Sequence, residues 1–344
     1  MNLTFRLLMV WMLFLVLAGR CNSLQYSSLR SSTFYATTPL RIPAATRSFS
    51  PSTITMMPEG PEVKTIANAL KLNVVGKSLT DITFNSGRYV NHGPPKNFEE
   101  FKASFPATVS EWCCKGKFQY FKLSVAHPEH RSCWITLGMS GRFIFAPPDA
   151  TPHKHARATF HLVNEKTGSP ADLVFVDTRN FGTIHFTLEE ALLQAKLKTL
   201  GPSILESELT PEMFLEICNT KKNPTINICK FLMNQKKISG VGNYILSEAL
   251  YKARINPYSA VGELTTTELF LLLEEIQSTA SQSLAAQGHT REKGGSFRSV
   301  SGYKGTFELV CYGRKICPAG YPITRETNGP HKRSLWWVPE LQQK

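Results

Sequence analysis

Met57-Pro58-Glu59-Gly60-Pro61-Glu62-Val63 stands where a leader-like segment gives way to the first amphipathic helix of the chain. From Glu62 to Lys77 apolar residues recur at helical spacing, with Pro61 suited to the first turn and Gly76 to the end. A proline that becomes the first residue of a chain carries a free secondary amine. An α-amine has a pKa near 8, against about 10.4 for lysine, so more of it is unprotonated at neutral pH. Such an amine can attack an aldehyde-like carbon and form an iminium.

Beyond this helix, the region from Ser78 to Phe186 consists of short β-rich runs separated by Gly, Pro and Asn clusters, which predicts an antiparallel sandwich or barrel. The expected strands are Leu79–Phe84, Lys117–Val125, Trp134–Leu137, Arg142–Phe145, Ala158–Val163, Leu173–Val176 and Thr183–Phe186. Helical patterns follow, at Leu188–Leu200, Thr210–Cys218, Thr225–Asn234, Asn243–Ala253 and Thr265–Ala286. Two last strand-like runs, Phe307–Tyr312 and Ser334–Val338, predict an appended β-hairpin.

The predicted fold class is therefore α+β, with an N-terminal β-sandwich and leading helix, a helical domain and a C-terminal hairpin. We expect a leader at 1–57 outside the fold, a catalytic sandwich domain at 58–190 and a helical domain at 200–290. A loop and the hairpin then occupy 291–344.

The charge of the chain is strongly positive, with a formal net charge of +13 and a pI near 9.4. This favours a polyanionic partner, which charge alone leaves as either nucleic acid or a membrane surface. Residues 291–344 hold ten basic and four acidic side chains, a localised excess that suits contacts with a nucleic-acid backbone. The eight cysteines are scattered without the spacing of a disulfide framework, which favours a reducing compartment.

The leader combines two kinds of targeting signal. Leu7–Ala18 is an apolar run of signal-peptide length, too short to span a membrane. Leu24–Thr55 is rich in Ser and Thr, holds arginines and lacks acids, as transit segments do. We expect an organelle location, plastid or mitochondrion, after leader removal, and no membrane contact in the mature form. The alternative is a true start at Met56 or Met57; translation from Met57 predicts a nuclear protein.

Five segments, taken in order, are similar to one family. They are Pro58-Glu59-Gly60-Pro61-Glu62-Val63, Lys115-Gly116-Lys117-Phe118, Leu137-Gly138-Met139-Ser140-Gly141, Asp177-Thr178-Arg179-Asn180-Phe181-Gly182 and the run from Leu232 to Tyr244. Together they resemble the formamidopyrimidine-DNA glycosylase and endonuclease VIII family. The resemblance runs from Pro58 to about Gln343 and includes a helix-two-turn-helix motif in the helical domain. It implies a monomeric, cofactor-free enzyme of base excision repair, a glycosylase and abasic-site lyase that acts on oxidised bases in damaged double-stranded DNA.

The resemblance also assigns catalytic roles to three residues. Pro58 attacks C1′ of the damaged nucleotide, displaces the base and leaves a Schiff base that permits β and then δ elimination. Glu59 moves protons during ring opening and base departure. Lys117 contacts the phosphate and the departing base. Taken alone, Pro58 reads as a turn proline, Glu59 as a first-turn acid beside the helix dipole, and Lys117 as a solvated strand lysine.

Excision of a base from a duplex requires the nucleotide to be flipped out and the gap to be filled. By the resemblance, Met139, Arg179 and Phe181 fill that gap. Asn243 has the residue type of a helix N-cap, beside glycines that let backbone amides approach a phosphate. For Phe181, core packing is the alternative. The Gly/Ser-rich segment Ser296–Gly305 reads as a mobile loop over the lesion.

Many family members hold zinc in the terminal hairpin through two Cys-x-x-Cys pairs. Here Cys317 begins an incomplete pair, and Cys311, Cys317 and His331 supply only three ligands at irregular spacing. We predict no metal and a zincless finger. Arg333 then matches the finger arginine that binds phosphate, and Lys332 accompanies it, with a solvated basic turn as the alternative.

Two other function classes fit parts of the sequence. A protein that recognises damaged DNA without cutting it would result if Pro58 never becomes the N-terminus. A structural nucleic-acid protein would keep all its activity when Pro58 and Glu59 are replaced.

Overall fold

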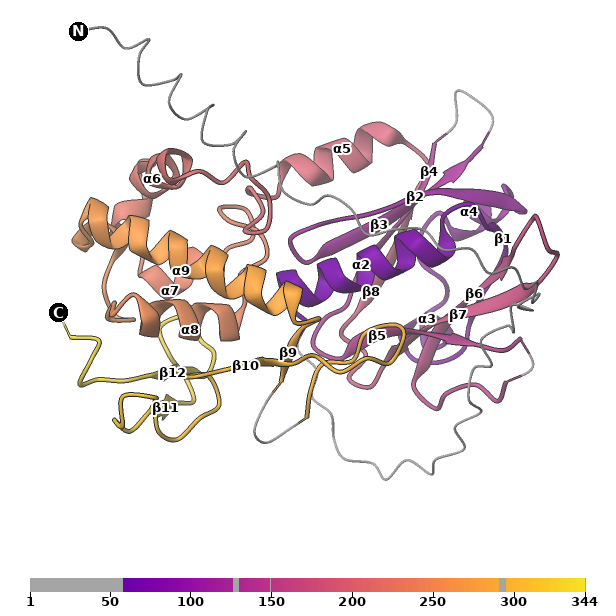
Figure 1. Ribbon diagram of the computed structural model, residues 1–344. Helices are drawn as coiled ribbons and strands as arrows, with labels where there is room; N and C mark the ends of the chain where they lie inside the picture. The colour runs from indigo at the N-terminus through magenta and orange to yellow at the C-terminus, as the bar shows by residue number, and fades with distance from the viewer. Residues whose placement is uncertain (1–57, 126–129, 149, 291–294, 344) are drawn as a thin grey trace, which may run out of the picture. The chain divides into compact units, whose positions relative to one another are not determined.

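The computed structural model describes residues 58–125, 130–148, 150–290 and 295–343, so the predicted leader lies outside the described residues. The fold is α+β, as expected, and begins with helix α2, Gly60–Val74. One side of α2 is buried, including Val63, Ile66 and Leu70, and this side packs on strand β2 of the sandwich. The same helix also contacts helix α9, Thr266–Ala285, which places its first turn between the two domains (Figure 1).

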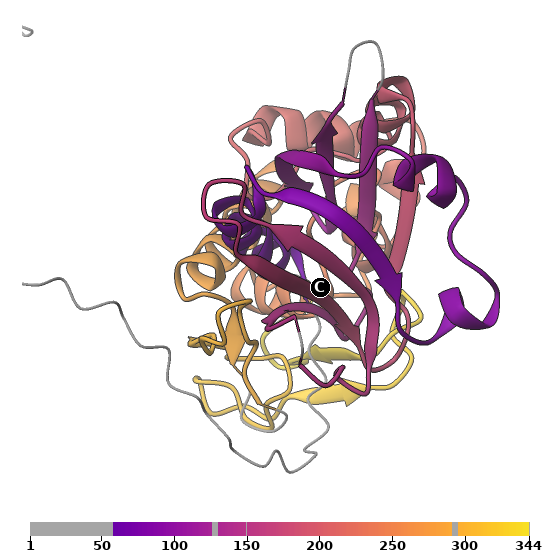
Figure 2. The same cartoon turned by 90° about the vertical axis from the view of Figure 1, so that its right-hand side faces the viewer.

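The sandwich is an antiparallel sheet of eight strands in the order β5-β7-β6-β1-β2-β3-β4-β8. The strands are β1 Ser78–Phe84, β2 Ala107–Lys115, β3 Phe118–Ser124, β4 Arg131–Thr136, β5 Gly141–Ala146, β6 Ala156–Val163, β7 Pro170–Asp177 and β8 Thr183–Thr187. The halves of the sheet join only through the short pairing of β1 with β2, so the sheet folds over on itself (Figure 2). Between the layers lies an aromatic core that includes Trp112, Phe121 and Phe143.

The predicted strands agree with the structure to within a few residues, but β2 and two short helices were not predicted. The helices are α3, Arg88–Asn91, and α4, Phe98–Lys102. In β2 the register shifts between Val109 and Glu111, and this irregularity interrupts the period-two pattern that identifies a strand. The strand is therefore visible only from its pairing with β1 and β3.

The second domain is helical. Helix α5, Glu190–Lys198, follows the sandwich and packs against its strands β4 and β8. The elements of the helical domain are α6 Pro211–Asn219, η1 Asn223–Thr225, α7 Ile228–Leu232, α8 Asn243–Lys252, η2 Val261–Glu263 and α9 Thr266–Ala285. The helix expected at Thr225–Asn234 is shorter, because the side chain of Asn227 accepts hydrogen bonds from Cys229 and Lys230 and starts α7 there. Of the helices that the structure describes, none is both long and apolar enough to cross a membrane.

The terminal hairpin differs from its prediction. It pairs β11, Thr324–Glu326, with β12, Leu335–Trp337, whereas the predicted first strand was Phe307–Tyr312. Only Phe307–Glu308 forms a strand there, β10, and it runs parallel to β9, His289–Thr290. The backbone N–H groups of residues 310–312 donate to the buried carboxylate of Glu248 instead, which leaves them no donors for a strand partner.

Candidate active site

Pro58 and Glu59 are buried at the start of α2, where the two domains meet. The two carboxylate oxygens of Glu59 accept the backbone N–H groups of Tyr244 (2.9 Å) and Ile245 (3.3 Å), in the first turn of α8. Glu59 therefore caps a helix of the other domain. Burial raises the pKa of Glu59 above its ordinary value, outweighing the opposite pull of Lys117 and these hydrogen bonds.

Lys117 lies in the turn between β2 and β3, and its buried amine is close to the Glu59 carboxyl group. Burial lowers the pKa of its amine, although the negative charge of Glu59 opposes the shift. A side chain at Gly242 would collide with both the Glu59 carboxyl group and the Lys117 amine. Gly116 has a positive φ of 55°, and a Cβ there would lie 2.6 Å from that of Ser239. These two glycines let the sandwich and the helical domain come close enough to share the site.

A cleft of about 420 Å³ opens over these groups. Six of the nine predicted site residues line it: Pro58, Glu59, Lys117, Met139, Asn243 and Arg333. They come from α2, from a turn and a loop of the sandwich, from α8 and from the finger. The fold thus brings together, around one cavity, residues that are up to 275 positions apart in the sequence.

Arg179 and Phe181 lie outside the lining of this cleft but beside the loop of Met139. The buried carboxylate of Asp177 joins the two loops, accepting from the Ser140 hydroxyl and from the backbone N–H of Gly182 (2.7 Å). The Arg179 guanidinium lies 5.1 Å from the centre of the Phe181 ring. Phe181 is 53% exposed, so the alternative of core packing is wrong.

The terminal hairpin of β11 and β12, here called the finger, is joined to α8 beside the cleft by polar contacts. The N-cap of α8 is Gly242, not Asn243 as predicted; Asn243 is the first helical residue. Its amide donates to the backbone oxygen of Ser334 (2.7 Å), while its carbonyl accepts from His331 Nε2 (2.8 Å). Burial and the nearby Arg333 lower the pKa of His331 to about 4, so its ring is neutral at physiological pH. Asn243 therefore fixes the turn that carries Arg333.

Arg333 and Lys332 are both exposed on this turn. Lys332 adopts a positive φ of 59°, and it does not line the cleft, whereas Arg333 does. The three residues that could have supplied metal ligands in the finger, Cys311, Cys317 and His331, lie in different surroundings. Cys311 and Cys317 belong to an apolar cluster with Tyr251 and Val338. His331 instead bonds Asn243, and within the described residues no three His, Cys, Asp or Glu side chains are grouped as metal ligands would be.

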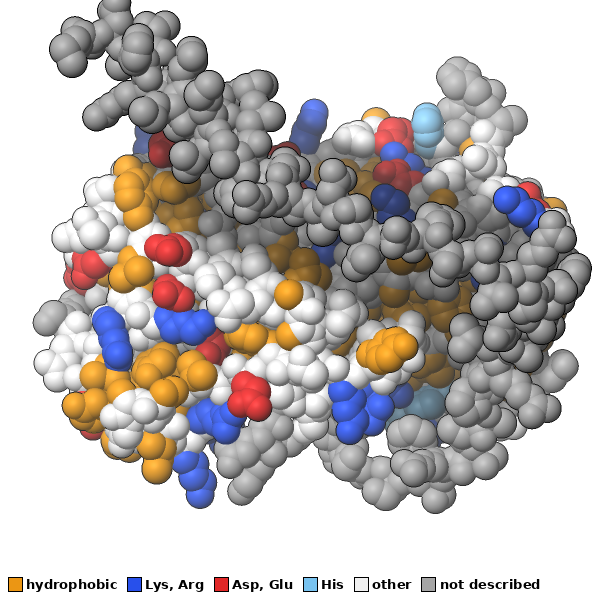
Figure 3. Space-filling model, in the orientation of Figure 1, with side chains coloured by type: hydrophobic (Ala, Val, Ile, Leu, Met, Phe, Trp, Pro, Cys, Tyr) orange, Lys and Arg blue, Asp and Glu red, His pale blue; other side chains and the backbone are white. Residues whose placement is uncertain are grey.

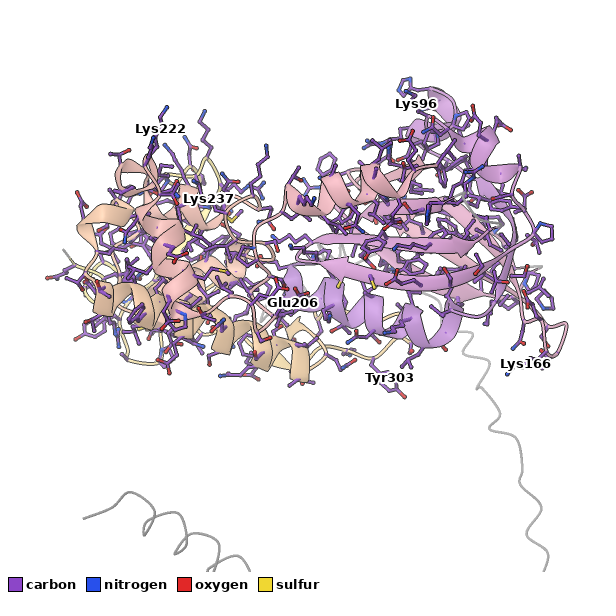
Figure 4. The ribbon with its side chains drawn as sticks, turned by 90° about the horizontal axis from the view of Figure 1, so that it is seen from above. Lys96, Lys166, Glu206, Lys222, Lys237 and Tyr303 are labelled. Atoms are coloured by element: carbon purple, nitrogen blue, oxygen red, sulfur yellow. The ribbon has the colours of Figure 1, made fainter. Side chains whose placement is uncertain are left out.

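Charged side chains of both signs lie on the surface of the two domains (Figure 3). On the described part of the face seen in Figure 3, acidic and basic side chains are interspersed, with no continuous basic surface. Viewed from above, Lys222 and Lys237 stand on the helical domain and Lys96 on the sandwich, with Glu206 in the connection between them (Figure 4). The amine of Lys237 contacts the side chain of Asn223.

Known proteins resemble this chain in sequence and in fold. Residues 57–184 match the formamidopyrimidine-DNA glycosylase N-terminal domain, and residues 200–293 match the H2TH domain of formamidopyrimidine-DNA glycosylase. The formamidopyrimidine-DNA glycosylase of Brevibacillus brevis is 32% identical over 267 residues, which cover 75% of this chain and 89% of that protein. The enzyme of that name from Bacillus licheniformis is 31% identical, covering 79% and 95%.

The chain belongs to the formamidopyrimidine-DNA glycosylase family. Crystal structures share its fold: that of a Lactococcus lactis Fpg variant in complex with Fapy-dG-containing DNA has a TM-score of 0.69 at 24% identity. That of the Lactococcus lactis Fpg with abasic-site-containing DNA has a TM-score of 0.68, also at 24% identity. Each covers 83% of this chain and 100% of the other.

In this family member, sequence reasoning missed the part played by Glu62, an acid in the first turn of α2. Glu62 is fully buried and accepts hydrogen bonds from five donors. These are the backbone N–H groups of Glu59 and His289, the His289 ring, the Tyr244 hydroxyl and the Ser283 hydroxyl. The charge and hydrogen bond of His289 lower the pKa of Glu62 despite burial, so it is a carboxylate. Its bond to Glu59 fixes the backbone next to Pro58.

The segment Ser296–Gly305, predicted as a mobile loop, carries two buried apolar side chains that were not predicted. Phe297 is 1% exposed and Val300 is 8% exposed, and both pack into the core of the sandwich. The backbone N–H of Phe297 donates to His289, and that of Gly305 donates to Phe297. The two apolar side chains had no periodic pattern around them to mark them as buried. These contacts hold Phe297 and Val300 against the sandwich, while residues 301–304 are exposed.

Proposed function

We propose that this protein is a DNA glycosylase that excises damaged bases from duplex DNA, and also a lyase that cleaves the resulting abasic site. The support is the cleft itself, where the predicted nucleophile, proton carrier and phosphate-binding residues meet in one cavity. The family membership and the damaged DNA in the titles of related Lactococcus lactis structures point the same way. The protein acts as a monomer in base excision repair, without a cofactor.

The reaction begins at the Pro58 nitrogen. Its lone pair forms a bond to C1′, the glycosidic bond breaks, and the base leaves with the bonding electrons and a proton. Opening of the sugar ring, with a proton to O4′, gives an iminium between Pro58 and C1′. Loss of a proton from C2′ expels the 3′ phosphate, and a second elimination expels the 5′ phosphate.

Glu59 is the proton carrier of these steps. Because burial raises its pKa, the carboxyl group keeps a proton at a higher pH than an exposed glutamate would. The lowered pKa of Lys117 likewise leaves more of its amine neutral and able to exchange a proton with the departing base. Met139, Arg179 and Phe181 occupy the gap in the duplex, and Asn243, Arg333 and Lys332 bind backbone phosphate.

The mechanism requires Pro58 to be the first residue, because an amide nitrogen has no lone pair to offer. We therefore propose that the active protein arises by removal of the residues before Pro58. If a targeting leader is removed, the protein works in an organelle; if translation starts at Met57, it works in the nucleus. Mass spectrometry of the native N-terminus tests whether the chain begins at Pro58, and the compartment in which that form is found distinguishes the two origins.

The decisive experiment is covalent trapping. A protein that begins at Pro58 is incubated with a duplex containing an oxidised base, and borohydride is added during the reaction. Reduction of the iminium should leave a stable protein–DNA adduct. A protein that keeps residues 51–57 is the matched control and should give none, because its Pro58 nitrogen is blocked. Lesion-selective binding without trapping by the first protein would instead establish a non-catalytic damaged-DNA-binding protein.

A further inference from the structure

Lys196 is a cation of the cleft that no sequence motif indicated. It lies on α5, the helix that follows the sandwich, and it lines the same cavity as Pro58 and Arg333. Its amine lies 5.4 Å from the centre of the Phe118 ring, and Phe118 directly follows Lys117 in the chain. Lys196 is half-buried, so its stem packs while its amine remains accessible.

Apolar contacts fix the orientation of α5 and therefore the position of Lys196. Leu193 is fully buried in a cluster with Phe118 and Tyr120, and Leu197 and Leu200 pack against the same cluster. Lys196 lies three residues after Leu193, which on a helix places it beside that anchor. The side chain is thus held at the cleft and does not sweep freely through solvent.

The charges of the cleft leave a place for an anion next to Lys196. Its ionisable lining residues are Glu59, Lys117, Lys196 and Arg333. Glu59 and Lys117 lie at the floor, whereas Arg333 comes from the finger and Lys196 from α5, on separate elements. Among the residues that the structure describes, no acid forms an ion pair with Lys196.

We propose that Lys196 binds a backbone phosphate of the strand that carries the damaged nucleotide, at a second point of the cleft from Arg333. This rests on the proposed function, since it names a substrate contact of the same site. A lysine in the last turn of a helix also complements the helix dipole. Lys198 is closer to the end of α5, is exposed and does not line the cleft. It complements the helix dipole equally well, so a comparison with Lys198 distinguishes phosphate binding in the cleft from an effect on the dipole.

The test compares Lys196→Met, Lys196→Arg and Lys198→Met. The methionine keeps the apolar stem on Phe118 and removes only the charge. Binding to a duplex with an uncleavable tetrahydrofuran abasic site is measured across salt concentrations, for the full chain and for the chain beginning at Pro58. Lys196→Met should bind about five- to twentyfold more weakly, with a salt slope shallower by about 0.9, the value for one lost phosphate contact. Lys196→Arg should restore both, and Lys198→Met should stay within about twofold of the unsubstituted protein.

An unchanged affinity and an unchanged salt slope for Lys196→Met would overturn the inference. So would an equal loss in Lys198→Met, which would indicate a general effect of charge or of the helix dipole. Thermal unfolding of each variant shows whether a loss of binding comes from misfolding. If Lys196→Met is misfolded, Lys196→Arg, which keeps the charge, decides whether the charge is what binds the phosphate. If the unsubstituted protein traps covalently while Lys196→Met binds normally, only this inference fails. If the unsubstituted protein does not bind the damaged duplex, the proposed function fails with it.

Discussion

The two sides of the cleft are held in place by different forces. The sandwich has a continuous apolar core, in which rings such as Trp112, Phe143 and Phe175 pack against one another. The finger has only short strands, and buried polar anchors on α8 position it, namely Glu248 at its first turn and Asn243 at the turn of Arg333. Apolar burial is spread over many residues, whereas a polar anchor depends on single groups. The finger therefore depends on these single groups in addition to its apolar contacts, which include Leu335 and Val338.

The largest effect is expected at Glu59, the acid at which both sides meet. Glu59→Gln keeps the size of the side chain but cannot carry the proton, so the single-turnover rate of base excision should fall by about 10²- to 10⁴-fold. Glu99→Gln, an exposed acid on α4, is the control and should leave the rate unchanged. Rates are measured by strand cleavage with enzyme in excess. A loss below threefold would remove Glu59 from proton transfer.

Glu248 tests the sensitivity of the finger. Glu248→Ala leaves three buried backbone N–H groups without their acceptor, because Val310, Cys311 and Tyr312 all donate to that carboxylate. We expect the free energy of unfolding in urea to fall by about 3–5 kcal/mol, the scale for breaking a buried charged network. Glu275→Ala on α9 removes a long ion pair, with 4.0 Å between the carboxylate and the Lys252 amine. It should lower the free energy of unfolding by less than about 1 kcal/mol. Equal effects of the two substitutions would contradict a finger held by polar anchors.

This difference also explains what the sequence could and could not predict. The strands of the sandwich follow from alternating apolar residues, since burial on one face leaves a pattern in the sequence. Glu62 and Glu248 look like any helix acids, because only their distant partners, such as His289 and Cys311, make them buried acceptors. The family motifs located Pro58, Glu59 and Lys117, but Lys196 belongs to no motif. Its place in the cleft depends on how α5 packs.

A smaller effect concerns stability against pH. The folded-state pKa of Glu59 is raised above its ordinary value of 4.5, so between the two values the folded protein holds more protons than the unfolded chain. The free energy of unfolding therefore falls as pH rises through that window, by at most about 1.4 kcal/mol per pH unit. Glu59→Gln lacks this contribution, so its stability relative to the unsubstituted protein should increase from pH 4.5 upward. Urea unfolding at several pH values measures this, and a constant difference would contradict a buried, raised pKa.

The smallest effect on stability is expected at Phe181, the exposed ring of the sandwich side. Phe181→Ala should change the free energy of unfolding by no more than about 0.5 kcal/mol, because the side chain is 53% exposed and lies outside the core. Phe175→Ala, a matched ring that is 1% exposed, should cost about 3–5 kcal/mol. If Phe181 instead fills the gap left by a flipped nucleotide, its loss should weaken binding to a damaged duplex while leaving binding to an intact duplex unchanged. If Phe181→Ala lost as much stability as Phe175→Ala, the Phe181 ring would have to be part of the apolar core. The apolar packing of the sandwich would then extend to the surface proposed to contact DNA.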